Sequence, residues 1–365
     1  MTSSPTAIDI FAGCGGLSLG MRRAGFDVVA AVELNAIAAA TYKANHHRTR
    51  LFEADVCEVE AKELRKVLGS CRLDLLMGCA PCQGFCSLTR KVRRDDPRNW
   101  LVLEMARLVG KLRPEVVMME NVPGLATVGR IIFDDFLKTL RRLGYYPTWH
   151  VVQMADYGVP QSRRRLVLLA GRGFGVPFPA STHARVPNDG GLKPWVTARE
   201  AIGGRVSPVT FPHATRRGGP RVFDWHVVRQ IQPQTRARLK AAQPGKTWLA
   251  VDERLRPECH RDGYQGFTNV YGRMAWDEPS PTITSGCTTP AKGRFGHPDR
   301  RRTTISVREA ALLQTFPDGY NFATDQIDAV CDMIGNAVPP RFARLVGHSI
   351  KAALEAHRAA LKRAG

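Results

Sequence analysis

The chain has 365 residues, of which 44% are hydrophobic and 24% charged, the balance of an ordinary globular protein. Its 53 Lys and Arg against 33 Asp and Glu give a formal charge of +20, which favours a polyanionic partner, nucleic acid before an anionic membrane. No apolar run approaches the roughly 20 residues of a membrane span, and residues 1–5 lack a signal-peptide pattern, so we expect a cytoplasmic protein without a membrane segment.

Nine cysteines are scattered along the chain, an odd number. Without an export signal they are expected to be reduced thiols. Cys79 and Cys82 have the spacing of a zinc or redox pair, but no second pair follows at a suitable distance. We therefore predict no metal site.

The N-terminal elements follow the order of a nucleotide-binding unit. They are a strand at 7–11, a glycine-rich turn at 12–20 with a helix continuing to 24, a strand at 26–32, a helix at 36–45 and a strand at 51–54. Glu33 and Asp55 end the second and third strands, and a carboxylate about 20 residues past the glycines is where such folds bind ribose. No Lys-Ser/Thr pair follows the glycines, which excludes a P-loop and favours an adenosine ligand carrying a carboxylate.

A second group of elements leads to a cysteine. The apolar run 73–78 predicts a buried strand, and Pro81 and Cys82 follow it at the sheet edge where open α/β sheets bind ligands. The residues after Cys82, up to Asn99, form a strongly basic segment that is either a solvated loop or a lid gripping phosphates.

The next strand carries a carboxylate. A helix is predicted at 100–112, and the apolar strand that follows it ends at Glu120. A carboxyl group at the end of a buried strand can stay protonated and act as an acid, although Glu120 and Asn121 can also cap the helix expected at 133–143.

Two arginines lie beside the last apolar strand of this region. A strand is predicted at 145–154, and Arg163 and Arg165 precede the apolar run 166–170. In an extended run these two side chains share a face while Arg164 points away. Arginines beside a buried strand require anionic or carbonyl partners.

Six segments, taken together, resemble the motifs of the DNA (cytosine-5) methyltransferases in that family's usual order. They are residues 9–16 (DIFAGCGG), 81–83 (PCQ), 120–122 (ENV), 161–165 (QSRRR), 308–317 (REAALLQTFP) and 335–340 (GNAVPP). The resemblance covers nearly the whole chain and is to the prokaryotic restriction-modification type. It implies an α/β, Rossmann-like S-adenosylmethionine-dependent methyltransferase fold with a smaller, irregular target-recognition domain.

The resemblance also implies a mechanism. Cys82 would add as a thiolate to carbon 6 of a flipped-out cytosine, which makes carbon 5 nucleophilic enough to accept a methyl group in a specific duplex DNA sequence. Glu120 would neutralise the ring at nitrogen 3, Arg165 would hold the ring carbonyl, and Arg163 would support the pocket and the thiolate. The base that finally removes the carbon 5 proton is left open.

The methyl donor, S-adenosyl-L-methionine, would bind at the glycine-rich turn. By resemblance, Phe11 packs on the adenine, Glu33 takes the ribose hydroxyls and Asp55 contacts the adenine amine. The full cofactor set implied is Phe11, Ala12, Gly13, Gly15, Gly16, Leu17, Glu33, Asp55, Asn336 and Val338. The DNA contacts implied are Gln83, Ser87, Arg93, Arg94 and Thr282.

The composition changes from about residue 171 to 300, where glycine and proline are frequent. This third of the chain has 20 Lys and Arg against 10 Asp and Glu, half of the excess charge. We expect a catalytic, cofactor-binding domain at 1–175 and 330–365 and a target-recognition domain at 176–329. A helix at about 341–362 is expected to pack beside the first motif, and Arg308 and Glu309 to fix the domain junction.

Two other functions remain open: a tRNA cytosine-5 methyltransferase, and a DNA-binding homologue that has lost catalysis. The large recognition region argues against the first, and the intact Cys82, Glu120, Arg163 and Arg165 argue against the second. We expect double-stranded DNA as partner, a monomer, no metal and a location at the prokaryotic nucleoid. Whether a separately encoded restriction endonuclease accompanies the chain is left open.

Overall fold

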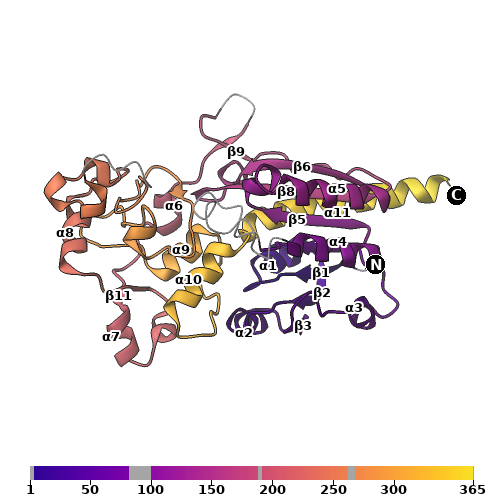
Figure 1. The fold of residues 1–365 in the computed structure, drawn as a ribbon, viewed down its shortest axis with the longest axis horizontal. Coiled ribbons are helices and arrows are strands. Elements are labelled where there is room, and N and C mark those ends of the chain that lie inside the picture. The colour runs from indigo at the N-terminus through magenta and orange to yellow at the C-terminus, as the bar shows by residue number, and fades with distance from the viewer. Residues whose placement is uncertain (1–3, 82–99, 188–190, 262–267, 365) are drawn as a thin grey trace. The chain divides into compact units, whose positions relative to one another are not determined.

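The computed structural model describes residues 4–81, 100–187, 191–261 and 268–364 (Figure 1). The chain divides into two compact units. The first comprises 1–154, 164–181 and 338–365, and the second comprises 155–163 and 182–337. Asn336 thus belongs to the second unit and Val338 to the first. Within the described ranges, no helix has the length and apolar character needed to cross a membrane.

The first unit is built on a seven-stranded sheet of order β3-β2-β1-β4-β5-β8-β6. Its strands are β1 (Thr6–Ile10), β2 (Asp27–Val32), β3 (Arg50–Phe52), β4 (Leu75–Gly78), β5 (Val116–Asn121), β6 (Tyr145–Gln153) and β8 (Arg164–Arg172). Its helices are α1 (Gly16–Arg23), α2 (Ala36–Asn45), α3 (Ala61–Leu68), α4 (Leu101–Leu112), α5 (Arg130–Arg142) and α11 (Pro340–Ala364). Strand β8 is antiparallel to both of its neighbours, β5 and β6, and the remaining pairs of the sheet are parallel. This topology confirms the predicted α/β, Rossmann-like fold.

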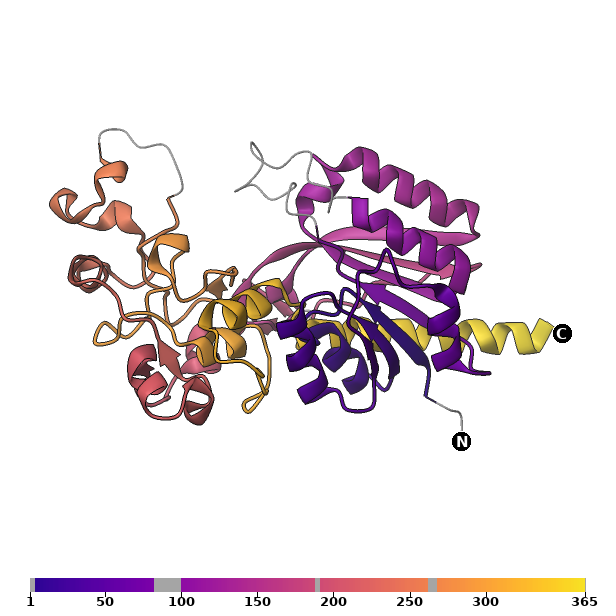
Figure 2. The same ribbon diagram turned by 60° about the horizontal axis from the view of Figure 1, so that its bottom comes forward.

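Helices cover both faces of this sheet because its central strands are apolar on both sides. Ile8 and Ile10 of β1 point to one face, where they join a core built with α3, α4 and α5. Figure 2 shows α4 and α5 along one face of the sheet and α11 along the other. The alternation of strand side chains therefore produces a three-layer unit.

Helices α1 and α11 pack in direct contact, and two glycines make this possible. A Cβ built on Gly20 would lie 2.3 Å from the Cβ of Ala343, and one on Gly347 would lie 2.6 Å from the Cβ of Ala24. The predicted packing of the C-terminal helix beside the first motif is confirmed.

The second unit consists of short elements. Its strands are β7 (Gln161–Ser162), β9 (His183–Ala184), β10 (Lys193–Pro194), β11 (Val209–Thr210), β12 (Val227–Val228) and β13 (Ser280–Pro281). Its α-helices are α6 (Ala198–Ile202), α7 (Phe211–Arg216), α8 (Pro233–Ala241), α9 (Val307–Leu313) and α10 (Ile327–Asn336).

A buried arginine organises part of this unit in place of a large sheet. Arg273 is 1% exposed, and its guanidinium donates hydrogen bonds to the carbonyl oxygens of Leu239 (2.8 Å), His297 (2.6 Å) and Arg302 (2.9 Å). Burial lowers the pKa of Arg273 to about 10. One side chain thus joins helix α8 to two loop segments at His297 and Arg302.

Candidate active site

Five strand ends of the first unit meet at one edge of the sheet. Strands β1, β2, β4 and β5 are parallel and present their carboxyl ends there, and β8, being antiparallel to β5, begins there. The strand order reverses between β1 and β4, which is where open α/β sheets bind ligands.

The turn after β1 has the backbone that its glycines predict. Gly13 and Gly15 have φ of +56° and +93°, and Phe11, which is not a glycine, has φ of +64°. A positive φ in a bulky residue is strained and is found preferentially at functional sites. The strain at Phe11 therefore marks this turn as a candidate ligand site.

Glu33, at the end of β2, holds the turn in place. Its Oε2 accepts a hydrogen bond from the backbone N–H of Gly13 and its Oε1 one from that of Asn35, both at 2.7 Å. Burial raises the pKa of Glu33. The carboxylate that sequence reasoning assigned to a ribose thus lies against the glycine turn.

The surroundings of the turn leave room for a ligand. A Cβ added at Gly13 would meet no atom within 4 Å, while Ala12 and Leu17 are buried and support the turn from below. Asp55 follows β3, and its Oδ1 accepts a hydrogen bond from the backbone N–H of Cys57 at 2.9 Å. Open space, a helix start at Gly16 and the Glu33 carboxylate fit an adenosine-type cofactor with an anionic group.

Sequence reasoning missed a buried network beneath this turn. Asp9 is fully buried in β1, and its Oδ2 accepts a hydrogen bond from Ser18 Oγ at 2.6 Å. Ser18 Oγ lies 2.8 Å from the hydroxyl of Tyr42. Burial raises the pKa of Asp9 to about 7. The sequence signal was a lone carboxylate within an apolar strand.

Glu120 and Arg165 form a buried ion pair at the same sheet edge. Arg165 Nε lies 3.1 Å from Glu120 Oε1, and the two side chains are 16% and 6% exposed. Glu120 is the fifth residue of β5, and Arg165 precedes the residue of β8 that pairs with Asn121. Residues assigned to two separate motifs are thus brought together, with an anion and a cation side by side.

The end of β4 is fastened to the end of β5 near this pair. Asn121 is 3% exposed, and its Nδ2 donates a hydrogen bond to the carbonyl of Ala80 at 3.1 Å. The chain reaches Pro81 from this anchored position. Cys82, Gln83, Ser87, Arg93 and Arg94 lie outside the described residues, so their assigned roles remain predictions.

Arg163 belongs to the second unit and has carbonyl partners. It is 1% exposed, and its Nη1 and Nη2 donate to the carbonyls of Ile283 and Gly335, each at 3.0 Å. The prediction that Arg163 and Arg165 need carbonyl or anionic partners is confirmed, since Arg163 has the first kind and Arg165 the second. Thr282 lies beside this segment, and its hydroxyl donates to the carbonyl of Ser162 at 2.8 Å.

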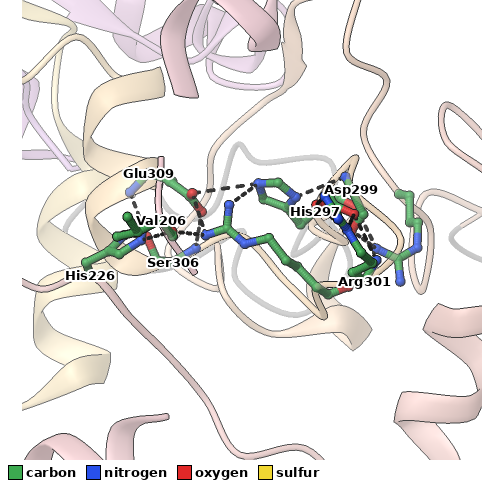
Figure 3. A network of polar contacts seen from close by, with 9 residues as sticks. Val206, His226, His297, Asp299, Arg301, Ser306 and Glu309 are labelled. Atoms are coloured by element: carbon green, nitrogen blue, oxygen red, sulfur yellow. Dashed lines mark hydrogen bonds and ion pairs between the residues drawn. The ribbon is translucent and has the colours of Figure 1, made fainter. Parts of the chain in front are cut away.

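Arg308 and Glu309 are interior residues of the second unit. Glu309 is fully buried, with Arg302 Nη2 at 3.0 Å and His297 Nε2 at 3.7 Å from its Oε1. Figure 3 shows this carboxylate linked through Ser306 to His226. Arg308 pairs with Asp224 of the same unit at 2.5 Å. These partners all belong to the second unit.

The described cysteines and acidic residues form no recognisable metal site. Within the described ranges, no group of three or more His, Cys, Asp or Glu side chains is arranged to hold a metal ion. Cys14 of the glycine turn is buried, which raises its pKa to about 12 and leaves it a poor nucleophile.

Comparison with known proteins agrees with this arrangement. A family model described as C-5 cytosine-specific DNA methylase matches residues 6–352. The chain is 38% identical to the type II methylase M.HgiDII of Herpetosiphon aurantiacus over 355 residues, 95% of each protein. It is 34% identical to the type II methyltransferase M.XorII of Xanthomonas oryzae pv. oryzae, covering 96% of this chain and 85% of that protein.

Solved structures share the fold. DNMT2 of Spodoptera frugiperda aligns with a TM-score of 0.63 at 18% identity, covering 96% of this chain and all of that one. Members of the matched family take their methyl group from S-adenosylmethionine and act through a covalent cysteine adduct. The chain belongs to the C-5 cytosine-specific DNA methylase family.

Proposed function

We propose that this chain methylates carbon 5 of a flipped-out cytosine in one short duplex DNA sequence, through a covalent adduct with Cys82. The observation that carries the proposal is the buried Glu120–Arg165 pair. It lies at the sheet edge where β4 leads toward Cys82 and where the glycine turn follows β1.

The chemistry requires each of these groups. The thiolate of Cys82 adds to carbon 6 of the ring, and the negative charge that develops is neutralised by a proton that the Glu120 carboxyl group shares with nitrogen 3 and by Arg165 at the carbonyl oxygen. Carbon 5 then takes the methyl group. Removal of the carbon 5 proton by a base lets the carbon–sulfur bond break, which restores the ring and the thiolate.

The cofactor residues of this proposal include those of the glycine turn. When bound, S-adenosylmethionine supplies the methyl group. Phe11 packs on the adenine, Glu33 binds the ribose hydroxyls and Asp55 contacts the adenine amine, with Asn336 and Val338 completing the set. The structural support is the strained Phe11 backbone and the open space beside Gly13.

DNA recognition is assigned to the second unit and to the segment after Cys82. Swinging the base out of the duplex costs a few kcal/mol. Contacts between the protein and the DNA strand offset this cost. Gln83, Ser87, Arg93, Arg94 and Thr282 are proposed to contact the DNA backbone. We further propose that the enzyme acts as a monomer, without a metal, on cytoplasmic nucleoid DNA, and that a separately encoded endonuclease shares its target sequence, since its relatives are type II methylases.

The test is transfer of labelled methyl from S-adenosylmethionine to unmethylated duplex DNA, followed by mapping of 5-methylcytosine at base resolution. The expected result is label at one short recurring sequence. Label on tRNA instead of DNA, or on neither, contradicts the proposal.

Duplexes carrying 5-fluorocytosine at the mapped site test the adduct itself. Once the methyl group has been transferred, fluorine at carbon 5 cannot be removed by a base, so in the presence of S-adenosylmethionine the wild type is expected to remain bound covalently. Cys82→Ala should bind the duplex without forming the adduct, and Glu120→Gln should form it at least about a hundredfold more slowly. Cys71→Ala, at an exposed cysteine, is the matched control and should behave as wild type.

A further inference from the structure

We propose that Cys79 is a positioning residue for Glu120, its thiol holding the carboxyl group in place for the cytosine ring. This inference rests on the proposed function of Glu120. In the sequence, Cys79 stands out only by its spacing from Cys82. That spacing does not indicate that Glu120 is its neighbour across the sheet.

Strand register places the two residues together. In the parallel pairing of β4 with β5, Gly78 lies opposite Met119. Cys79 is the first residue after β4 and Glu120 is the next residue of β5, so the two are neighbours at the sheet edge and their side chains are expected on the same face.

The backbone on both sides of Cys79 is fixed. A Cβ at Gly78 would lie 2.4 Å from the carbonyl oxygen of Ile10, so the strand passes β1 in direct contact. One residue beyond Cys79, the Asn121 amide holds the Ala80 carbonyl. Cys79 is therefore presented to Glu120 from a clamped segment.

Among the described residues, the Glu120 carboxylate has few partners besides Cys79. The residue is 5% exposed, and among the described residues its Oε1 accepts no hydrogen bond of good geometry, although Arg165 Nε lies 3.1 Å away. A buried carboxylate with an unsatisfied oxygen depends strongly on each remaining donor.

The Cys79 thiol is suited to donate a hydrogen bond and unsuited to act as a nucleophile. Burial, the charges of Glu120 and Asp9, and a hydrogen bond with the Glu120 carboxylate raise the pKa of Cys79 well above its ordinary range. Cys79 thus stays protonated at neutral pH. A neutral S–H beside a carboxylate is a donor, whereas the nucleophile of this reaction must be a thiolate.

The central experiment compares Cys79→Ala and Cys79→Ser with the wild type and with the control Cys71→Ala. Cys79→Ala should lower kcat about tenfold, the effect of losing one hydrogen bond to a charged group, with KM for DNA and for S-adenosylmethionine unchanged. Cys79→Ser keeps a donor and should retain most of kcat.

A double-mutant cycle separates positioning from packing. Adding Cys79→Ala to Glu120→Gln should cause no further loss, since the thiol then has no carboxylate to hold. An equal loss in both backgrounds, a Cys79→Ala variant with wild-type kcat, or a serine variant as slow as the alanine variant would overturn the inference. If Glu120→Gln itself has wild-type activity, the proposed function fails instead.

Discussion

At the scale of single residues, the charged groups beneath the site carry a cost to stability. Asp9 has one buried oxygen that accepts no hydrogen bond within the described part of the chain, and its other oxygen accepts one from Ser18 Oγ. An ionised carboxylate in this position is poorly compensated. Burial accordingly raises the pKa of Asp9 to about 7.

Replacing this carboxyl should change how stability depends on pH. Because the folded-state pKa lies above the unfolded value, the wild type loses stability as pH rises from about 4 to 7, by about 1.4 kcal/mol per pH unit. Asp9→Asn does not ionise, so its free energy of unfolding relative to wild type should rise by roughly 2–3 kcal/mol between pH 5 and 7. Urea unfolding at each pH measures this, and a constant difference between the two proteins contradicts it.

The sequence predicted which residues need partners but not which partners they have. Arg163 and Arg165 were recognised as side chains requiring carbonyl or anionic groups. The carbonyls that Arg163 uses lie 120 and 172 residues further along the chain, and the carboxylate facing Arg165 lies on another strand. Strand register brings Glu120 to Arg165, and the packing of the second unit brings the carbonyls of Ile283 and Gly335 to Arg163. Neither is encoded locally.

At the scale of elements, the close contact between α1 and α11 offers a direct test of packing. Gly20→Ala would place a methyl group 2.3 Å from the Cβ of Ala343 and 2.6 Å from the carbonyl oxygen of Pro340. We expect a loss of about 1–3 kcal/mol in the free energy of unfolding, because the helices must separate.

Gly110→Ala in α4 is the matched control. Its new methyl group would meet only Leu143 Cδ1, at 3.7 Å. Alanine restricts the unfolded chain and favours helix, so a gain of roughly 0.5–1 kcal/mol is expected. Denaturant unfolding followed by circular dichroism measures both, and similar effects of the two substitutions would rule out a packing origin.

Elements with a local signal were predicted closely, and elements without one were not. Helix α2 was predicted at 36–45 and observed at Ala36–Asn45, because Asn35 caps it through bonds to the N–H groups of Ile37 and Ala38. The two-residue strands of the second unit have no periodicity to detect. Part of this unit is instead held by Arg273, which bonds carbonyls 24–34 residues away in the sequence.

At the scale of the whole molecule, charge governs the first encounter with DNA. The formal charge is +20 over the whole chain. Each phosphate neutralised by Lys or Arg releases a counterion, so binding weakens as salt rises.

This predicts a strong salt dependence for binding to duplexes of any sequence. The plot of log affinity against log salt should have a slope steeper than about −4, corresponding to about five phosphate contacts. Fluorescence anisotropy with an unmethylated duplex between 50 and 200 mM salt measures it. A slope near zero would mean that the Lys and Arg side chains do not neutralise DNA phosphates, which contradicts the prediction.

The pairing of α1 with α11 also sets an order of events during synthesis. The first unit receives its last helix only after the entire second unit has been made, since residues 182–337 separate them. At about 5–20 residues per second, α1 waits roughly 15–65 s on the ribosome before α11 exists. Nascent and prematurely terminated chains therefore present the glycine turn without the helix that packs behind it, and methylation competence arises only at the end of translation.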